Sequence, residues 1–501
     1  MLTRIANEDS RLSFWLRVRE FAVPASMIET ATARRRVGDW AGACAAAGID
    51  VDLDLRAVAR VHGRAFVSRL RDDLRHLAPD LLRWHLPRVA PDGLLRPGVT
   101  VSLARYEADV AVGGAGRDDT RWPVHLVVRT PPAWADSGQR ISLALWDASG
   151  SVAGDRRHPH PRPDRRFRLD LHRHLWDARR TGELRVRCGA DRPPPGDDPP
   201  PPAQLDPASE LPGPGCAVDR WAAEAQIVLR AEGRTTGSVL VRFGSGRRLV
   251  LDPAGGRDAR PVLRGAAGCV SALPVLPDAA TWVLPDLELL RTGAIEAGRL
   301  HPLVASALVP EHVVPEHVVP EHVVPEHVVP EYLGTEYLGT EYLGTEYAAP
   351  GPGRLPDRAG RARLVECRGA THRIGLVDGV LAALDHDPAE IRREELLAAL
   401  TGTPLPCLQA IDRAHRRPDC LFGVRERLVH GDVAGALAVV EGLLGPEAVL
   451  RDGALRDELE AAAQRRITYG LFRAGLIGPG PGQDRRRPGH LRAHPRHGAR
   501  R

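Results

Sequence analysis

Eight consecutive pentapeptides occupy residues 309–348, and this tract limits what the chain can fold into. Four read VPEHV, one VPEYL, two GTEYL and one GTEYA, so glutamate is third in every unit. A period of five matches neither a helix nor a strand, and no apolar face can form. Proline in the first five units also removes backbone donors. We therefore predict a low-complexity tract that folding does not require; the alternative is a flexible ligand for a partner.

The histidines of the pentapeptides do not form a metal site. They recur every five residues, at 312, 317, 322 and 327. In an extended chain, neighbouring histidines would be ~15 Å apart. That separation is too large for one ion with bonds of ~2 Å.

Two further stretches have compositions that do not favour folding. Residues 189–215 are rich in proline, glycine and aspartate, and they cannot bury enough apolar surface to fold. Residues beyond 478 consist mainly of glycine, proline, arginine and histidine. We expect the first stretch to be a disordered linker and the second a disordered basic tail.

The pattern predicts an α+β protein with a helical N-terminal part, small antiparallel β units and a helical C-terminal domain. The predicted order is a helical and β region at 1–188, the linker at 189–215, a small α+β region at 216–308, the pentapeptides at 309–348, a linker at 349–361, a β-meander with helices at 362–478, and the tail at 479–501.

Hydrophobic periodicity places the individual elements. Helices are predicted at 24–88, 170–184, 218–231, 285–308 and 388–474, the last with Leu455, Leu459, Ala463, Ile467 and Leu471 as its buried stripe. Strands are predicted at 99–103, 123–128, 141–146, 238–243 and 248–251, with a meander at 363–367, 371–377 and 380–384.

All 69 basic residues are arginine, which excludes several kinds of chemistry. A phosphate-binding loop of the Walker type, a protein kinase and a Schiff-base enzyme each need a lysine. The net charge is +5, and residues 484–501 alone carry seven arginines and one aspartate, or +6. The body is therefore near neutral, and nucleic acid would be contacted only through the tail.

The cysteines indicate a reducing compartment. There are seven, at positions 44, 188, 216, 269, 367, 407 and 420. Their number is odd, their spacing is wide and no C-x-x-C occurs, so we predict no metal site, no cofactor and a cytoplasmic location. No apolar run of 18 residues predicts a membrane span.

Two segments 393 residues apart echo each other. Residues 38–45 read GDWAGACA and residues 431–438 read GDVAGALA. A glycine ends one helix and an aspartate caps the next, and the second glycine of each segment, Gly42 or Gly435, would leave the helix thin enough for close packing. We predict two tight helical hairpins, which are either independent structural units or two interaction modules.

The candidate site residues are few. Asp385, His386 and Asp387 resemble an acid/base cluster, with Arg373 and His372 nearby in the meander, although Asp387 already caps a helix. His172 and His174, with Asp170 and Asp177, are interpreted as a solvated face.

Other patterns fall short of the motifs they resemble. Gly113, Gly114 and Gly116 lack the third glycine of a dinucleotide-binding fingerprint, because residue 119 is Asp119. Ser149 and Ser245 lie outside a nucleophile elbow.

Several stretches resemble a family of actinomycete proteins without an assigned activity. They are FAVPASMIETATARRRVGDWAGACAAAGIDV, DLRHLAPDLLRWHLPR, HLWDARRTGELR and LDHDPAEIRREELLAALTG. The resemblance implies a cytoplasmic actinobacterial protein and assigns no functional residue. Residues 425–476 also resemble a degraded ankyrin-type hairpin that lacks the T-P-L-H signature.

With no catalytic constellation in the sequence, we expect a non-enzymatic interaction or scaffold protein with a protein partner. The alternatives are an enzyme with a dispersed site around Arg373, Asp385 and His386, and a protein that contacts nucleic acid through its basic tail.

Overall fold

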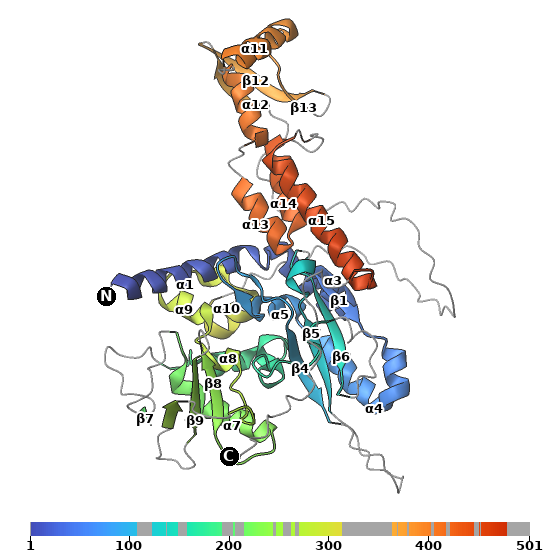
Figure 1. Ribbon diagram of the computed structural model, residues 1–501, viewed down its shortest axis with the longest axis vertical. Helices are drawn as coiled ribbons and strands as arrows, with labels where there is room; N and C mark the ends of the chain where they lie inside the picture. The colour runs from blue at the N-terminus through green and yellow to red at the C-terminus, as the bar shows by residue number, and fades with distance from the viewer. Residues whose placement is uncertain are drawn as a thin grey trace, which may run out of the picture. The chain divides into compact units, whose positions relative to one another are not determined.

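The computed structural model divides the chain into two compact units (Figure 1). The larger unit comprises Met1–His312, Cys420–Leu437 and Gly453–Arg501, and the smaller unit Val313–Asp419 and Ala438–Asp452. The structure describes residues 2–107, 123–136, 138–148, 158–192, 204–205, 215–243, 247–253, 262–265, 270–312, 363–367, 369–377, 380–401, 405–416, 421–444, 450 and 452–477. The predicted α+β class is confirmed.

A four-stranded sheet forms the centre of the larger unit. Its strands are β1 (Ile49–Asp52), β4 (Thr100–Tyr106), β5 (Val124–Arg129) and β6 (Ile141–Trp146), in the order β1-β6-β5-β4. The three predicted strands β4, β5 and β6 are confirmed and pair antiparallel. The sequence did not predict β1, which pairs parallel to β6 and is too short for its alternation to stand out among helices.

Helices pack around this sheet. They are α1 (Leu2–Phe21), α2 (Ala25–Arg36), α3 (Trp40–Ala46), α4 (Leu55–His76), α5 (Pro79–His85), α6 (Leu184–Cys188), α9 (Pro285–Arg291) and α10 (Pro302–Leu308). In α4, the predicted core residues Phe66, Leu70 and Leu74 are buried. Residues from α9 and α10 share one core with residues from α4 and α5, so the division predicted between 1–188 and 216–308 does not separate two cores.

The helix predicted at 170–184 is wrong. Residues Leu169–Leu171, Arg173–Leu175 and Thr181–Glu183 form short 3-10 turns instead. The Trp176 carbonyl accepts a hydrogen bond from Ala78 N, and the Trp176 indole donates to Leu169 O. These tertiary partners take backbone groups that a helix would have paired internally.

A second, smaller core also belongs to the larger unit. Helix α7 (Val218–Ala231) packs with α8 (Asp278–Thr281) against β8 (Val239–Phe243), β9 (Arg247–Asp252) and β10 (Val262–Gly265). Its centre contains Trp221, which is 1% exposed. The short strand β7 (Gln204–Leu205) pairs with β10, so two residues of the predicted linker are part of a sheet.

Three C-terminal helices complete the described chain: α13 (Leu421–His430), α14 (Val433–Leu444) and α15 (Ala454–Ala474). The buried Arg83 of α5 donates to the carbonyl oxygens of Ala22, Ala47, Gln139 and His430. Burial lowers the pKa of Arg83 to about 10. These contacts place α13 in the larger unit. The predicted region at 362–478 is therefore shared between the two units and is not one domain.

Both echoing segments form the predicted turn between two helices, and α2 packs on α3 as a hairpin requires. Gly38 and Gly431 end α2 and α13 with φ of 79° and 90°. The carboxylates that cap α3 and α14 accept from Gly42 N and Gly435 N. The second glycine has a different role from the predicted one, because a Cβ at Gly42 or Gly435 would lie 2.1 or 2.2 Å from a capping carboxylate oxygen. Glycine at this position therefore makes room for the cap.

The stripe predicted for α15 is confirmed only at its start. Leu455 is buried as predicted, but Ile467 is 56% exposed, and Tyr469, which is outside the stripe, is buried. Steps of four residues rotate by ~40° each around a helix, so the predicted stripe turns away from the core. Tyr469 instead donates a hydrogen bond to Asp50 on β1, and Arg473 pairs with Asp52.

The smaller unit contains a three-stranded meander, two whole helices and the part of α14 from Ala438 onward. Strands β11 (Arg363–Cys367), β12 (Ala370–Val377) and β13 (Val380–Ala383) pair antiparallel in sequence order, as predicted. Helix α11 (Pro388–Thr401) follows, and α12 (Pro406–Arg416) packs on the meander.

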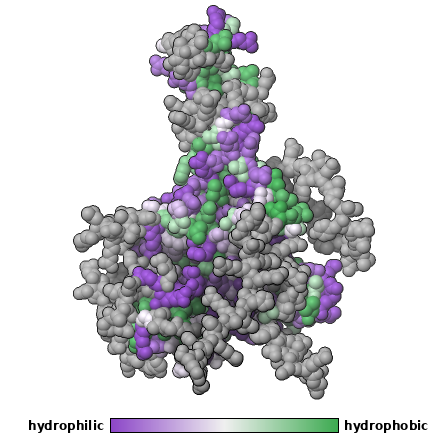
Figure 2. Space-filling model, in the orientation of Figure 1, coloured by the Kyte–Doolittle hydropathy of each residue, from purple (hydrophilic) through white to green (hydrophobic). Residues whose placement is uncertain are grey.

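The described surface is mixed in character. Among the coloured residues of Figure 2, hydrophilic and hydrophobic ones lie side by side. In the described part of the chain, no helix combines the length and apolar character that crossing a membrane requires.

Candidate metal centre

Two cysteines and a histidine from separate segments meet in the smaller unit. Cys367 ends β11, His386 lies in the loop between β13 and α11, and Cys407 is the second residue of α12. Alternation along β11 turns Val365 and Cys367 to the same side of the meander. Helix α12 covers that side, which brings Cys407 to the end of β11.

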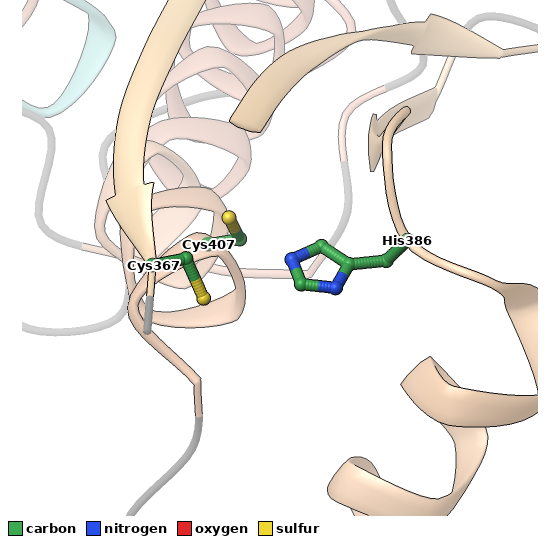
Figure 3. A group of neighbouring side chains, drawn as sticks. All are labelled: Cys367, His386 and Cys407. Atoms are coloured by element: carbon green, nitrogen blue, oxygen red, sulfur yellow. The ribbon is translucent and has the colours of Figure 1, made fainter. Parts of the chain in front are cut away.

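The three side chains point toward one another (Figure 3). One ligand atom from each, the two sulfurs and an imidazole nitrogen, lies within 4.8 Å of the others. Both cysteines are 0% exposed, and the His386 side chain is 4% exposed. These residues therefore form a small buried cluster of nitrogen and sulfur donors.

The surroundings of His386 orient its ring. Its Nδ1 lies 3.6 Å from a Glu390 carboxylate oxygen, and its Nε2 has no hydrogen-bond partner in the described residues. The ring of His372 stacks on it, with centroids 4.2 Å apart and planes at 11°. A carboxylate facing one imidazole nitrogen while the other stays available is the usual arrangement around a metal-binding histidine.

The Cys407 thiol resists ionisation on its own. Burial, together with its hydrogen bond to Cys367, raises the pKa of Cys407 to about 11. Both cysteines are free thiols. A divalent ion would displace their protons, since thiolate is the form that binds metal.

This donor set fits Zn²⁺. Zinc binds thiolate sulfur at ~2.3 Å and imidazole nitrogen at ~2.0–2.1 Å in tetrahedral geometry. Those bonds place two sulfur ligands ~3.8 Å apart, so ligand atoms that lie within 4.8 Å of one another would have to approach by at most about 1 Å. Three protein ligands leave a fourth position for another donor. The stacked His372 cannot fill it in this orientation, because the in-plane lone pairs of parallel rings do not converge on one point.

The predicted acid/base cluster does not form one site. Arg373 donates through its side chain and backbone to Asp385, both at 2.7 Å, and this pair lies at the surface. These hydrogen bonds lower the pKa of Asp385 to about 2. Adjacent strand residues face opposite sides, so His372 points toward the cluster and Arg373 away from it. Asp387 caps α11 by accepting from Ala389 N at 3.0 Å, as predicted.

The solvated face predicted for His172 and His174 is also wrong. They are 2% and 3% exposed, and Asp177 is fully buried. The His172 Nε2 lies 3.2 Å from Glu224, which also accepts two hydrogen bonds from Arg187 at 2.8 Å. These histidines belong to a buried ionic network of the larger unit.

The remaining predictions concern residues outside the described part of the chain. They are the glycines at 113–116, Ser149, Ser245, the pentapeptides from residue 313 onward, and the tail at 479–501.

The sequence analysis found His386 but not its convergence with two cysteines. Cys367 and Cys407 are 40 residues apart and do not stand in a short ligand motif. A usable signal was present, because Cys367 ends the first strand of the meander, Cys407 opens a later helix, and His386 lies between them in the sequence. No model of a protein family, no curated protein and no solved structure matches this chain.

Proposed function

We propose that the smaller unit is a zinc-binding module and that the ion has a structural role. The observation that carries this proposal is the buried convergence of Cys367, His386 and Cys407. Structural zinc sites bind cysteine and histidine and supply folding free energy directly. Reduced thiols are also what the proposed cytoplasmic location would maintain.

The small size of the apolar core favours a structural ion. Its buried residues are Cys367, Ile374, Ala383, Leu405, Cys407 and Ile411. A core of this size supplies little stability, and small domains commonly add a metal or disulfides. An ion held by β11, the loop after β13 and α12 would join three segments that are distant in sequence.

The module then presents a surface for a protein partner, in keeping with the expected scaffold role. Leu364, Val377 and Leu384 are 65%, 49% and 38% exposed. By strand alternation they lie on the side of the meander opposite the metal ligands. Exposed apolar residues that gather on one face are a common property of interaction surfaces.

Metal content of the full-length protein tests the zinc proposal. We expect one zinc per chain after purification under reducing conditions, and none in the C407S variant. The matched control is C216S, which removes a partly buried thiol in the larger unit and should keep its zinc. A wild-type protein that contains no zinc after exposure to the ion, or that joins Cys367 to Cys407 in a disulfide, would overturn the proposal.

The interaction proposal needs its own variant. An L364E, L384E double substitution should abolish recovery of a stoichiometric partner from an actinomycete lysate while leaving zinc content unchanged. Retention of the same partner by the variant, or recovery of no partner by the wild-type protein, would count against this face.

A further inference from the structure

A second feature, in the larger unit, points to an anionic ligand. A groove of about 960 Å³ lies between the segment that leads into β4, the loop at 159–167, and strands β8 and β9. Six arginines line it: Arg96, Arg162, Arg165, Arg166, Arg242 and Arg248. Among the lining residues, Asp164 is the only carboxylate.

Two of the six arginines form ion pairs or hydrogen bonds with other groups of the protein. Arg166 forms a two-bond ion pair with Asp278 at 3.0 and 2.7 Å. Arg165 donates to Ser271 O at 2.9 Å and to Leu273 O, which fixes the far wall of the groove. These two arginines therefore shape the groove, and the remaining four supply its positive charge.

The positions of Arg242 and Arg248 are unfavourable for the stability of the sheet. They are direct cross-strand partners in the antiparallel pair of β8 and β9. Like charges directly opposite each other destabilise a sheet, and guanidinium groups stay protonated at any relevant pH. Neither side chain has a carboxylate partner among the described residues. The placement of two positive charges opposite each other does not stabilise the fold. It is explained if both arginines bind an anion that lies over the two strands.

The wall formed by residues 159–164 is fixed by hydrogen bonds within the protein. Thr100 Oγ1 donates to His160 O at 2.6 Å, and Asp164 N donates to Thr100 O at 2.9 Å. Prolines at 159, 161 and 163 restrict the backbone between these anchors. A rigid wall lowers the entropy that ligand binding must offset.

We propose that this groove binds a short chain of phosphate groups, as carried by inorganic tripolyphosphate or by the triphosphate of a nucleotide. Arginine is suited to phosphate because its planar fork donates two parallel hydrogen bonds. The volume lies within the range of small-molecule sites. Phe167 is buried, and no Trp or Tyr is among the lining residues, so the groove lacks the large exposed aromatic rings of single-strand-binding grooves.

Calorimetric titration of the full-length protein with tripolyphosphate is the test. The R242Q, R248Q variant should bind at least tenfold more weakly than the wild type. The control R180Q, R456Q removes two exposed arginines elsewhere and should bind as the wild type does. Equal affinities for wild type and R242Q, R248Q, or equal losses in both variants, would overturn the proposal.

Three further measurements separate the ligand sources. ATP should compete with tripolyphosphate, and adenosine should not bind. Deleting residues 484–501 should leave tripolyphosphate affinity unchanged, because the arginines that we propose as ligands lie between residues 96 and 248. If a 20-nucleotide single strand binds in the groove and tripolyphosphate does not, the ligand is nucleic acid and the proposal is wrong.

A stability measurement guards against misfolding of the variant. Removing one of two opposed charges should leave the thermal midpoint of R248Q without ligand equal to or above that of the wild type. Tripolyphosphate should raise the midpoint of the wild type more than that of R248Q. A variant that melts well below the wild type would show instead that the arginine pair serves stability.

Discussion

The buried ion pair between Arg19 and Asp286 should be among the most sensitive points of the larger unit. Their side chains are 3% and 0% exposed, and two hydrogen bonds of 2.8 Å join them. The Trp84 indole also donates to Asp286, at 3.1 Å. The pair connects α1 to α9 and α5, so removing the carboxylate leaves a buried guanidinium without its counter-charge.

The expected loss for D286A is ~3–5 kcal/mol, the usual cost of breaking a buried pair on one side. With roughly 300 ordered residues and an unfolding entropy of ~2.1 cal/mol/K per residue, each kelvin corresponds to ~0.6 kcal/mol. The thermal midpoint should therefore fall by roughly 5–8 °C, as measured by differential scanning calorimetry.

A matched exposed pair provides the control. Arg180 and Glu183 are 2.7 Å apart, with side chains 46% and 40% exposed. E183Q should cost less than ~0.5 kcal/mol, because exposed pairs contribute little. The apolar double variant R19M, D286L should be less destabilised than D286A, since it leaves no buried charge. Equal midpoints for D286A and E183Q would refute this reasoning.

Three other predictions address the caps, the pH dependence and the repeat. Chemical denaturation should find G435A ~1–2 kcal/mol less stable than G470A, because a Cβ at Gly435 displaces the cap of α14 whereas one at Gly470 meets nothing within 4 Å. Burial alone would raise the pKa of Glu224, but hydrogen bonds from its histidine and arginine neighbours hold it at about 2. Because the folded-state pKa of Glu224 is depressed, its ionised carboxylate stabilises the fold fully above pH ~4.5, and this stabilisation is lost as the pH falls toward 2. The difference in urea stability between wild type and E224Q should therefore shrink between pH 6 and pH 3. Deleting residues 319–338, which are four pentapeptides, should leave the thermal midpoint within a few degrees, and a large drop would show that the repeat is a folded part.

Local signals predicted most of the regular elements. The strands β4, β5 and β6 and the meander carry runs of β-branched and apolar residues bounded by turns, and α7 was placed at its observed bounds. Asp387 was recognised as a cap because proline follows it at the first helical position. These features depend on residues that are close together in sequence.

Features that depend on distant residues were missed. The pairing of Arg83 with carbonyl groups from four segments assigns α13 to the larger unit, and no local pattern encodes it. The histidine at 172 is polar and looked solvated, yet its partner Glu224 is 52 residues away. For the same reason the metal cluster was invisible, since Cys367 and Cys407 come together only when α12 packs on the meander.

The most direct test of the central claim is X-ray absorption at the zinc K edge of the full-length protein. The account predicts a shell of two sulfur atoms at ~2.3 Å and at least one imidazole nitrogen at ~2.0–2.1 Å. The C407S variant should give no zinc edge, because it lacks one of the three ligands. A shell of oxygen and nitrogen alone in the wild-type protein would contradict the account, because the ion would then lie away from the two cysteines.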